Sequence, residues 1–210
     1  MVILIGGSSH VGKTLLAQKL LEKYHWPYLS LDHLKMGFIR SGRTELTVQD
    51  DYEMRYFLWP FVAEMIRTVI EGKQNLIVEG CYIPAEWQES FSEDELRKIR
   101  CVFVVMSEAY LRGNFDAVRS CANAIESRTA DDPDLERLIR CSQYFKSECI
   151  EHGIPCLEIC ERFDLDELVA EWKRKEKQEA EEKAKADQIA DENEDDGYAP
   201  VTLPGEDEEL

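Results

Sequence analysis

Residues 7–14 read G-S-S-H-V-G-K-T and match the pattern G-x-x-x-x-G-K-[ST] at all four of its fixed positions. The residues on either side restrict the fold further. Residues 1–5 form a short apolar run that predicts a strand, and residues 15–24 are good helix formers. A strand that enters such a loop and a helix that leaves it indicate an α/β fold with a parallel sheet.

The same loop has the chemistry of a phosphate-binding site. Gly7 and Gly12 permit the curvature that lets successive backbone N–H groups converge on one phosphate chain. Lys13 adds a positive charge, the helix N-terminus adds a partial one, and Thr14 offers a hydroxyl to Mg²⁺. We therefore expect a nucleoside-triphosphate site with Mg²⁺, formed by Gly7, Ser8, Ser9, His10, Val11, Gly12, Lys13, Thr14 and Leu15.

Apolar runs and helix signals alternate along the rest of the chain. Further strands are expected at residues 28–31, 75–78, 101–106 and 154–159, which gives five strands separated by helices. This order favours a parallel sheet that is covered on both faces.

Helix start and stop signals lie between these strands. A long helix is expected over residues 50–72, and Pro60 should kink it or divide it in two. Ser92 and Glu95 have the spacing of a capping box that opens a short helix. Asp132 and Pro133 should open a helix that runs to about residue 152, and a last helix should run from Asp164 through Trp172.

The charge is unevenly distributed along the 210 residues, which carry a net charge of −18. Residues 173–210 hold six basic and fourteen acidic side chains, a net charge of −8. We expect one domain over residues 1–172, an exposed helical extension over 173–190 and a disordered acidic tail over 191–210. Neither part has a basic stripe, which argues against a nucleic-acid partner.

The compartment is predicted from apolar runs and cysteines. No apolar run reaches the ~20 residues that span a bilayer, and the strand and loop at the N-terminus leave no room for a signal peptide. Seven cysteines lack C-x-x-C spacing and are expected to be reduced thiols. We expect a cytoplasmic protein with no membrane partner, either a monomer or a dimer.

Several classes of triphosphate-binding protein lack support in the sequence. The guanine-reading motif N-K-x-D and the motif L-S-G-G-Q do not occur, and the domain is too short for a ring ATPase with its helical lid. A compact kinase for a small acceptor remains.

Three motifs resemble those of one group of kinases. They are G-S-S-H-V-G-K-T, L-S-L-D-H at residues 29–33, and L-I-V-E-G at residues 76–80. Over residues 1–172 the chain resembles small-molecule kinases of the nucleoside-monophosphate kinase class, which include shikimate, gluconate, zeta-toxin-like and 2-phosphoglycerate kinases. The resemblance implies a three-layer α/β/α P-loop NTPase fold with sheet order 2-3-1-4-5, a helical lid at about residues 107–132, and ATP as the phosphoryl donor.

Candidate acceptor-binding residues follow the second and third strands. Asp32 ends the second strand, where a carboxylate could orient or deprotonate an acceptor hydroxyl, or alternatively cap a helix. Glu79 and Gly80 end the third strand, and Asp32 and Glu79 could both hold Mg²⁺ through water. Arg40 and Arg55 have guanidinium groups suited to a carboxylate or phosphate of the acceptor, and the resemblance implies that role for Arg55.

Lid arginines would stabilise the charge on the transferred phosphoryl group. Arg119 and Arg128 are the preferred pair, followed by Arg137. The acceptor is expected to be a small polar metabolite such as a phosphorylated sugar acid, a nucleoside or nucleotide, or an amino-sugar nucleotide. Leu34 stands where shikimate kinases have the second aspartate of D-x-D, which argues against shikimate itself.

A different class of function stays open at this point. The acidic tail is also compatible with a nucleotide-binding regulatory or toxin–antitoxin module that hydrolyses slowly and acts by binding a partner. A degenerate enzyme that binds triphosphate without transfer is a third reading, but the intact Gly12-Lys13-Thr14 and Asp32 argue against it.

Overall fold

The computed structural model describes residues 1–121 and 134–162, and then residues 164, 166, 169, 170, 174, 177, 181 and 185. The chain divides into two compact units, Met1–Trp172 and Lys173–Leu210. In the second unit the described residues are helical and exposed. Several expectations lie outside the described residues, namely those on Arg128, Asp132, Pro133, Trp172 and the stretch 191–210.

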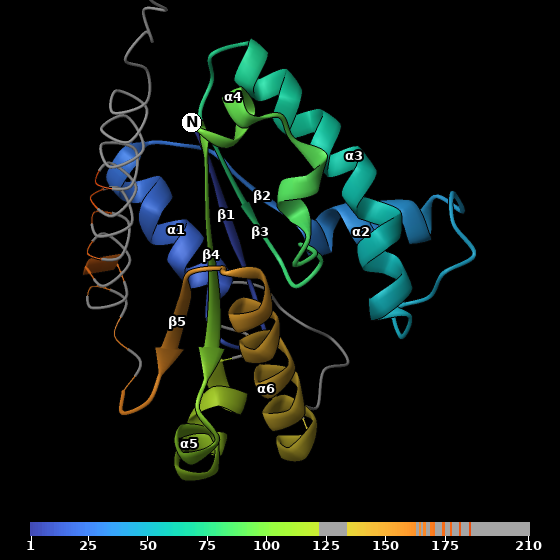
Figure 1. Ribbon diagram of the computed structural model, residues 1–210. Coiled ribbons are helices and arrows are strands. Elements are labelled where there is room, and N and C mark those ends of the chain that lie inside the picture. Colours follow the sequence, from blue (N-terminus) through green and yellow to red (C-terminus); the bar gives the residue numbers. More distant parts are fainter. Residues whose placement is uncertain are drawn as a thin grey trace, which may run out of the picture. The chain divides into compact units, whose positions relative to one another are not determined.

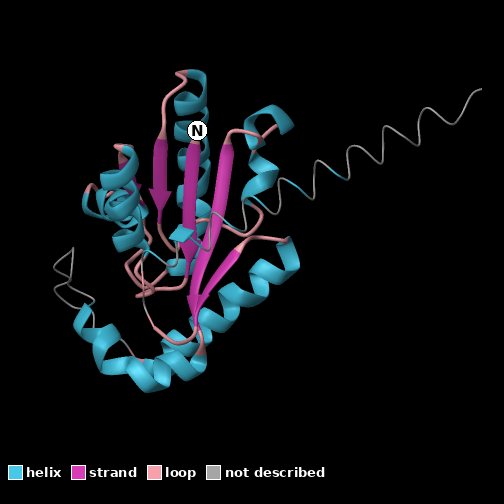
Figure 2. Cartoon of the chain, turned by 90° about the vertical axis from the view of Figure 1, so that its left-hand side faces the viewer, coloured by secondary structure: helices cyan, strands magenta, loops and turns pink. Residues whose placement is uncertain are grey.

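Five parallel strands form one sheet in the order β2-β3-β1-β4-β5, with helices on both faces (Figures 1 and 2). The predicted α/β fold and its strand order are confirmed. The strands are β1 (Val2–Gly7), β2 (Tyr28–Ser30), β3 (Leu76–Glu79), β4 (Ile99–Met106) and β5 (Cys156–Ile159).

The helices connect these strands in chain order (Figure 1). They are α1 (Lys13–Tyr24), α2 (Leu31–Arg40), α3 (Asp51–Glu71), the short 3₁₀ helix η1 (Trp87–Ser90), α4 (Glu93–Leu96), α5 (Glu108–Cys121) and α6 (Leu135–His152).

Side chains of the sheet alternate between two hydrophobic clusters, as the pleat of a strand requires. On β1, Val2 and Leu4 join a cluster with α3 and the C-terminal half of α6. Ile3 and Ile5 point into a second cluster with α1, α5 and the N-terminal half of α6. Because both faces are covered, the loops at the carboxyl ends of the strands form the edge at which polar side chains gather.

The long helix over residues 51–71 differs from the expectation in one respect. Pro60 lies inside α3, which runs from Asp51 to Glu71 as one helix, so the predicted division in two is wrong. Pro60 itself is exposed, whereas Leu58, Trp59 and Val62 beside it are buried in the core. Packing of the residues on either side holds the helix together across the proline.

The start of α6 also differs from the prediction. Asp134 is the N-cap, and its side chain accepts a hydrogen bond from the backbone N–H of Arg137 at 2.7 Å. The helix therefore begins two residues later than the Asp132–Pro133 pair predicted. It ends as expected at Gly153, which has a positive φ of 63°. None of the helices in the described part of the chain is long and apolar enough to cross a membrane.

Candidate active site

The loop between β1 and α1 has the tight curvature that its glycines predict. Gly7, His10 and Gly12 have φ angles of 110°, 64° and 82°. A Cβ atom on Gly7 would lie 2.1 Å from the carbonyl oxygen of Val104, so no other residue fits between the loop and β4. The loop leads directly into the N-terminus of α1, where backbone N–H groups favour an anion.

Lys13 places a positive charge inside this loop. Its side chain is 8% exposed, and Nζ donates a hydrogen bond to the carbonyl oxygen of Ser8 at 2.6 Å. Lys13 also lines a cleft of about 1440 Å³, which is above the range of ~300–1000 Å³ that is typical for one ligand. The cleft is therefore large enough for a nucleotide and a second small molecule.

A buried hydrogen bond connects the loop to α6. Ser8 and Ser142 share a hydrogen bond of 2.9 Å between their hydroxyl oxygens, and both residues are buried. The backbone N–H of Met106 also donates to the Ser142 hydroxyl at 3.4 Å. Sequence reasoning missed Ser142, because it lies 134 residues from Ser8 and belongs to no motif.

Thr14 and Glu79 bring together the oxygen ligands that Mg²⁺ prefers. The Thr14 hydroxyl donates to Glu79 Oε1 at 3.3 Å, and Glu79 is 1% exposed at the end of β3. These two residues would suit a Mg²⁺ ion, because a hydroxyl and a carboxylate are oxygen ligands of the kind that this ion prefers. Among the described residues no cluster of three or more His, Cys, Asp or Glu side chains could hold a metal by itself.

Gly80 follows Glu79 and allows two elements to approach closely. It has a φ of 154°, and a Cβ atom there would lie 2.8 Å from Cβ of Leu31. The missing side chain therefore admits the start of α2 against the end of β3. Neither Gly80 nor Glu79 is among the residues that line the cleft.

Asp32 lies in the first turn of α2 and lines the cleft. Ser30 occupies the N-cap position, so the alternative interpretation of Asp32 as the cap is wrong. The cleft brings Asp32 together with other residues singled out in the sequence, namely Ser9, His10, Lys13, Arg40, Arg55 and Arg137.

A buried polar network that the sequence did not predict forms one wall of the cleft. Lys35 is 6% exposed, and its Nζ contacts Asp51 Oδ1 at 2.8 Å, the Tyr82 hydroxyl at 2.6 Å and the carbonyl oxygen of Val48 at 3.2 Å. The Tyr82 hydroxyl donates to Asp51 Oδ1 at 2.9 Å. These contacts use all three donors of the ammonium group and pair its charge.

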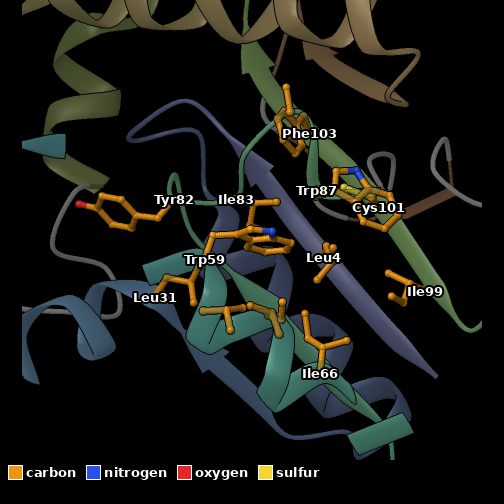
Figure 3. Packing of buried hydrophobic residues seen from close by; sticks show 14 of the residues in the cluster. Leu4, Leu31, Trp59, Ile66, Tyr82, Ile83, Trp87, Ile99, Cys101 and Phe103 are labelled. Atoms are coloured by element: carbon orange, nitrogen blue, oxygen red, sulfur yellow. The ribbon is translucent and has the colours of Figure 1, made fainter. Parts of the chain in front are cut away.

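Tyr82 joins this network to the hydrophobic core. Its ring belongs to the core cluster, but its hydroxyl points away from the other labelled side chains (Figure 3). Burial is the largest of the causes that raise the pKa of Tyr82, and the nearby Cys81, Asp32 and Asp51 raise it further. The phenol therefore stays protonated at neutral pH and donates to Asp51.

Arg55 is a buried cation that lines the cleft. It is 7% exposed on α3, and its guanidinium donates to the Tyr144 hydroxyl at 3.1 Å and to the carbonyl oxygen of Cys81 at 3.4 Å. It also lies over the rings of Tyr144 and Phe145, at 5.6 and 5.0 Å from their centroids. All of these partners are neutral, and Arg55 Nε is buried without a hydrogen-bond partner in the described part of the chain.

The three arginines predicted for the lid differ in where they lie. Arg119 lies on α5, is exposed and does not line the cleft, while Arg128 is outside the described residues. Arg137 in the first turn of α6 lines the cleft and contacts Asp51 Oδ2 at 3.4 Å. Of the two lid arginines that the structure describes, Arg137 lines the cleft and Arg119 does not.

Comparisons with known proteins concern the fold. No protein-family model and no curated protein sequence matches the chain. Three solved structures illustrate the similarity. A gluconokinase from Sinorhizobium meliloti is 16% identical, with 81% of this chain and 88% of that chain covered and a TM-score of 0.43.

The other two have similar values. A shikimate kinase from Aquifex aeolicus is 16% identical, with 86% of this chain and 98% of that chain covered and a TM-score of 0.45. A sugar kinase from Janibacter sp. is 13% identical, with 81% of this chain and 90% of that chain covered and a TM-score of 0.48. The chain is similar in structure to P-loop small-molecule kinases, at low sequence identity.

Proposed function

We propose that this protein is an ATP- and Mg²⁺-dependent phosphotransferase that acts on a small, polar, anionic metabolite. The observation that carries the proposal is the shared cleft, in which Lys13 of the phosphate loop, Asp32 and the buried Arg55 all take part. Lys13 suits the phosphate chain of a nucleotide. Asp32 suits the hydroxyl group of an acceptor, and Arg55 suits an anionic group of that acceptor.

The residues divide into a donor half and an acceptor half. Loop N–H groups and Lys13 would hold the β- and γ-phosphates, and Thr14 with Glu79 would hold Mg²⁺. The bound ion would supply positive charge that offsets the charge on the phosphate oxygens. Buried polar contacts hold the donor half in place before ligand binds, which reduces the cost of organising it.

Asp32 is the residue for the acceptor hydroxyl. In the transfer step the hydroxyl oxygen bonds to the γ-phosphorus, the bond from that phosphorus to the β–γ bridging oxygen breaks, and the hydroxyl proton passes to the Asp32 carboxylate. Arg137 would neutralise charge on the transferred group. We propose the same role for Arg119 and Arg128 of the expected lid. Arg55 would bind an anionic group of the acceptor and so orient its hydroxyl.

The proposal is tested first at the nucleotide site. Thermal unfolding is measured with ATP, ADP or GTP, each with and without Mg²⁺, for the wild type and Lys13→Ala. Ligand at ~100 times its dissociation constant stabilises a protein by about 2.7 kcal/mol, which is several degrees for a domain of this size. We expect a Mg²⁺-dependent ATP shift in the wild type that Lys13→Ala abolishes.

Lys23→Ala is the matched control, because Lys23 lies on the same helix but is exposed and does not line the cleft. It should keep the full ATP shift. A wild type that no triphosphate stabilises contradicts the proposal. An ATP shift without ADP release in the presence of any small acid, nucleoside or nucleotide favours the regulatory module instead.

A further inference from the structure

One carboxylate connects several segments of the chain at the cleft. Asp51, in the first turn of α3, accepts hydrogen bonds from Lys35 of α2 and from Tyr82, which follows β3. Its second oxygen contacts Arg137 in the first turn of α6. All four residues line the cleft. The starts of α3 and α6 are therefore joined at the cleft by an ion pair.

The two oxygens of Asp51 have cationic partners in different surroundings. Lys35 contacts Oδ1 at 2.8 Å, and its side chain is 8% exposed. Arg137 contacts Oδ2 at 3.4 Å, and its side chain is 72% exposed. Separating a buried ion pair is costly, whereas a long and exposed ion pair contributes little because water screens it. The pair with Lys35 is therefore lasting, and the pair with Arg137 is the one that can exchange.

Release of Arg137 leaves no buried charge unpaired. Asp51 keeps the Lys35 ammonium and the Tyr82 hydroxyl as partners of Oδ1. Its side chain is 44% exposed, so water can reach the second oxygen. A guanidinium that leaves a carboxylate for a phosphate oxygen forms charge-assisted hydrogen bonds of the same kind. A phosphate in the cleft can therefore replace Asp51 as the partner of Arg137.

We propose that Arg137 exchanges between Asp51 and a phosphate oxygen of a ligand in the cleft, and that Lys35 is the counter-ion that keeps the cost of this exchange low. Asp51 is then a positioning residue, which holds the Arg137 side chain at the cleft and competes with the ligand for it. The proposal rests on the proposed function for the role of Arg137 in transfer, but the competition is a binding property that is measurable without turnover.

Replacing the buried pair tests this competition at constant charge. Lys35→Met combined with Asp51→Asn removes one positive and one negative charge, so the net charge of the cleft stays the same. The probes are inorganic pyrophosphate and ATP, each titrated with Mg²⁺ by calorimetry. We expect this double variant to bind the probes about two- to fivefold more tightly than the wild type, because an exposed ion pair no longer competes for Arg137.

The gain in affinity should depend on Arg137. Adding Arg137→Met to the double variant should remove it. Glu136→Gln is the control, because it removes a negative charge beside Arg137 from a carboxylate that pairs with Arg112 and does not line the cleft. It should bind both probes as the wild type does. No gain with either probe, a gain that survives Arg137→Met, or the same gain in Glu136→Gln overturns the proposal.

Asp51→Asn alone is the second variant, for the case that the double variant does not fold. It leaves Lys35 without its counter-ion, which itself attracts anions, so the diagnostic quantity is the part of the gain that Arg137→Met removes. If the probes show this dependence for pyrophosphate while no triphosphate stabilises the wild type, the exchange stands and the kinase reaction does not. If ATP stabilises the wild type and the dependence on Arg137 is absent, the exchange is wrong and the proposed function stands.

Discussion

A single buried hydroxyl group supports the loop between β1 and α1. Ser142 is 3% exposed and contacts both Ser8 in the phosphate loop and the backbone N–H of Met106 at the end of β4. It thereby connects α6 to the loop through one hydroxyl group. A buried group that loses such a partner is left unsatisfied, which costs more than the hydrogen bond itself contributes.

Ser142→Ala is therefore expected to lower the free energy of unfolding by about 1–3 kcal/mol and to weaken ATP binding. Ser147→Ala is the control on the same helix, since Ser147 is exposed and contacts only the carbonyl oxygen of Tyr144 among the described residues. Chemical denaturation and ATP titration measure the two effects. Identical results for both serine variants would show that Ser142 does not support the loop.

At the scale of elements, a capping box begins the short helix α4, which lies between β3 and β4 in the chain. Ser92 and Glu95 form the capping box of α4, in which Glu95 Oε2 accepts from the backbone N–H of Ser92 at 2.8 Å and from its hydroxyl at 2.9 Å. The backbone hydrogen bond is the largest cause that lowers the pKa of Glu95. Ionised Glu95 therefore stabilises the folded state.

The sign of the pH dependence follows from that lowered pKa. Glu95→Gln should be less stable than the wild type above the ordinary glutamate pKa of 4.5. The difference should shrink as the pH falls through the lower pKa of the folded state, because the wild-type carboxylate is then protonated too. Urea denaturation of both proteins between pH 3 and 7 measures it, and a constant difference across this range would contradict the capping role. Glu93→Gln is the control, because Glu93 lies in the same turn but makes no capping contact.

At the scale of the whole molecule, packing and charge are divided between two parts of the sequence. Every buried hydrophobic side chain in the described part of the chain lies between Val2 and Val169. Residues 173–210 carry fourteen acidic and six basic side chains. The stability of the cleft should therefore come from the unit Met1–Trp172 alone.

A protein that ends at Trp172 is expected to unfold cooperatively and to keep the Mg²⁺-dependent ATP shift of the full chain. Both properties are measurable by calorimetry in parallel with the full-length protein. If the shorter protein folds but loses the ATP shift, residues 173–210 contribute to the nucleotide site. If it aggregates, they contribute to folding.

Much of the fold could be predicted because its signals are local. The pattern at Gly7–Thr14, the five apolar runs and the capping box each depend on residues that are close in sequence, and the structure has all of them. Two expectations are wrong, namely the division of the helix at Pro60, which was one of the two outcomes predicted there, and the start of α6 at Asp132 and Pro133. Core packing holds α3 together across its proline, and Asp134 caps α6 instead of Asp132.

The sequence by itself determined the phosphate loop, the parallel sheet and the placement of Asp32 beside them, because motif spacing and hydrophobic periodicity encode these features directly. Only the tertiary structure decided which distant side chains meet. Ser8 with Ser142, Lys35 with Asp51 and Tyr82, and Arg55 over Tyr144 and Phe145 are such contacts. The physical reason is that the sequence does not distinguish a charged or hydroxyl side chain that is buried from one that is solvated. Only packing removes the water that would otherwise form hydrogen bonds with such a group, so that it needs a partner within the protein.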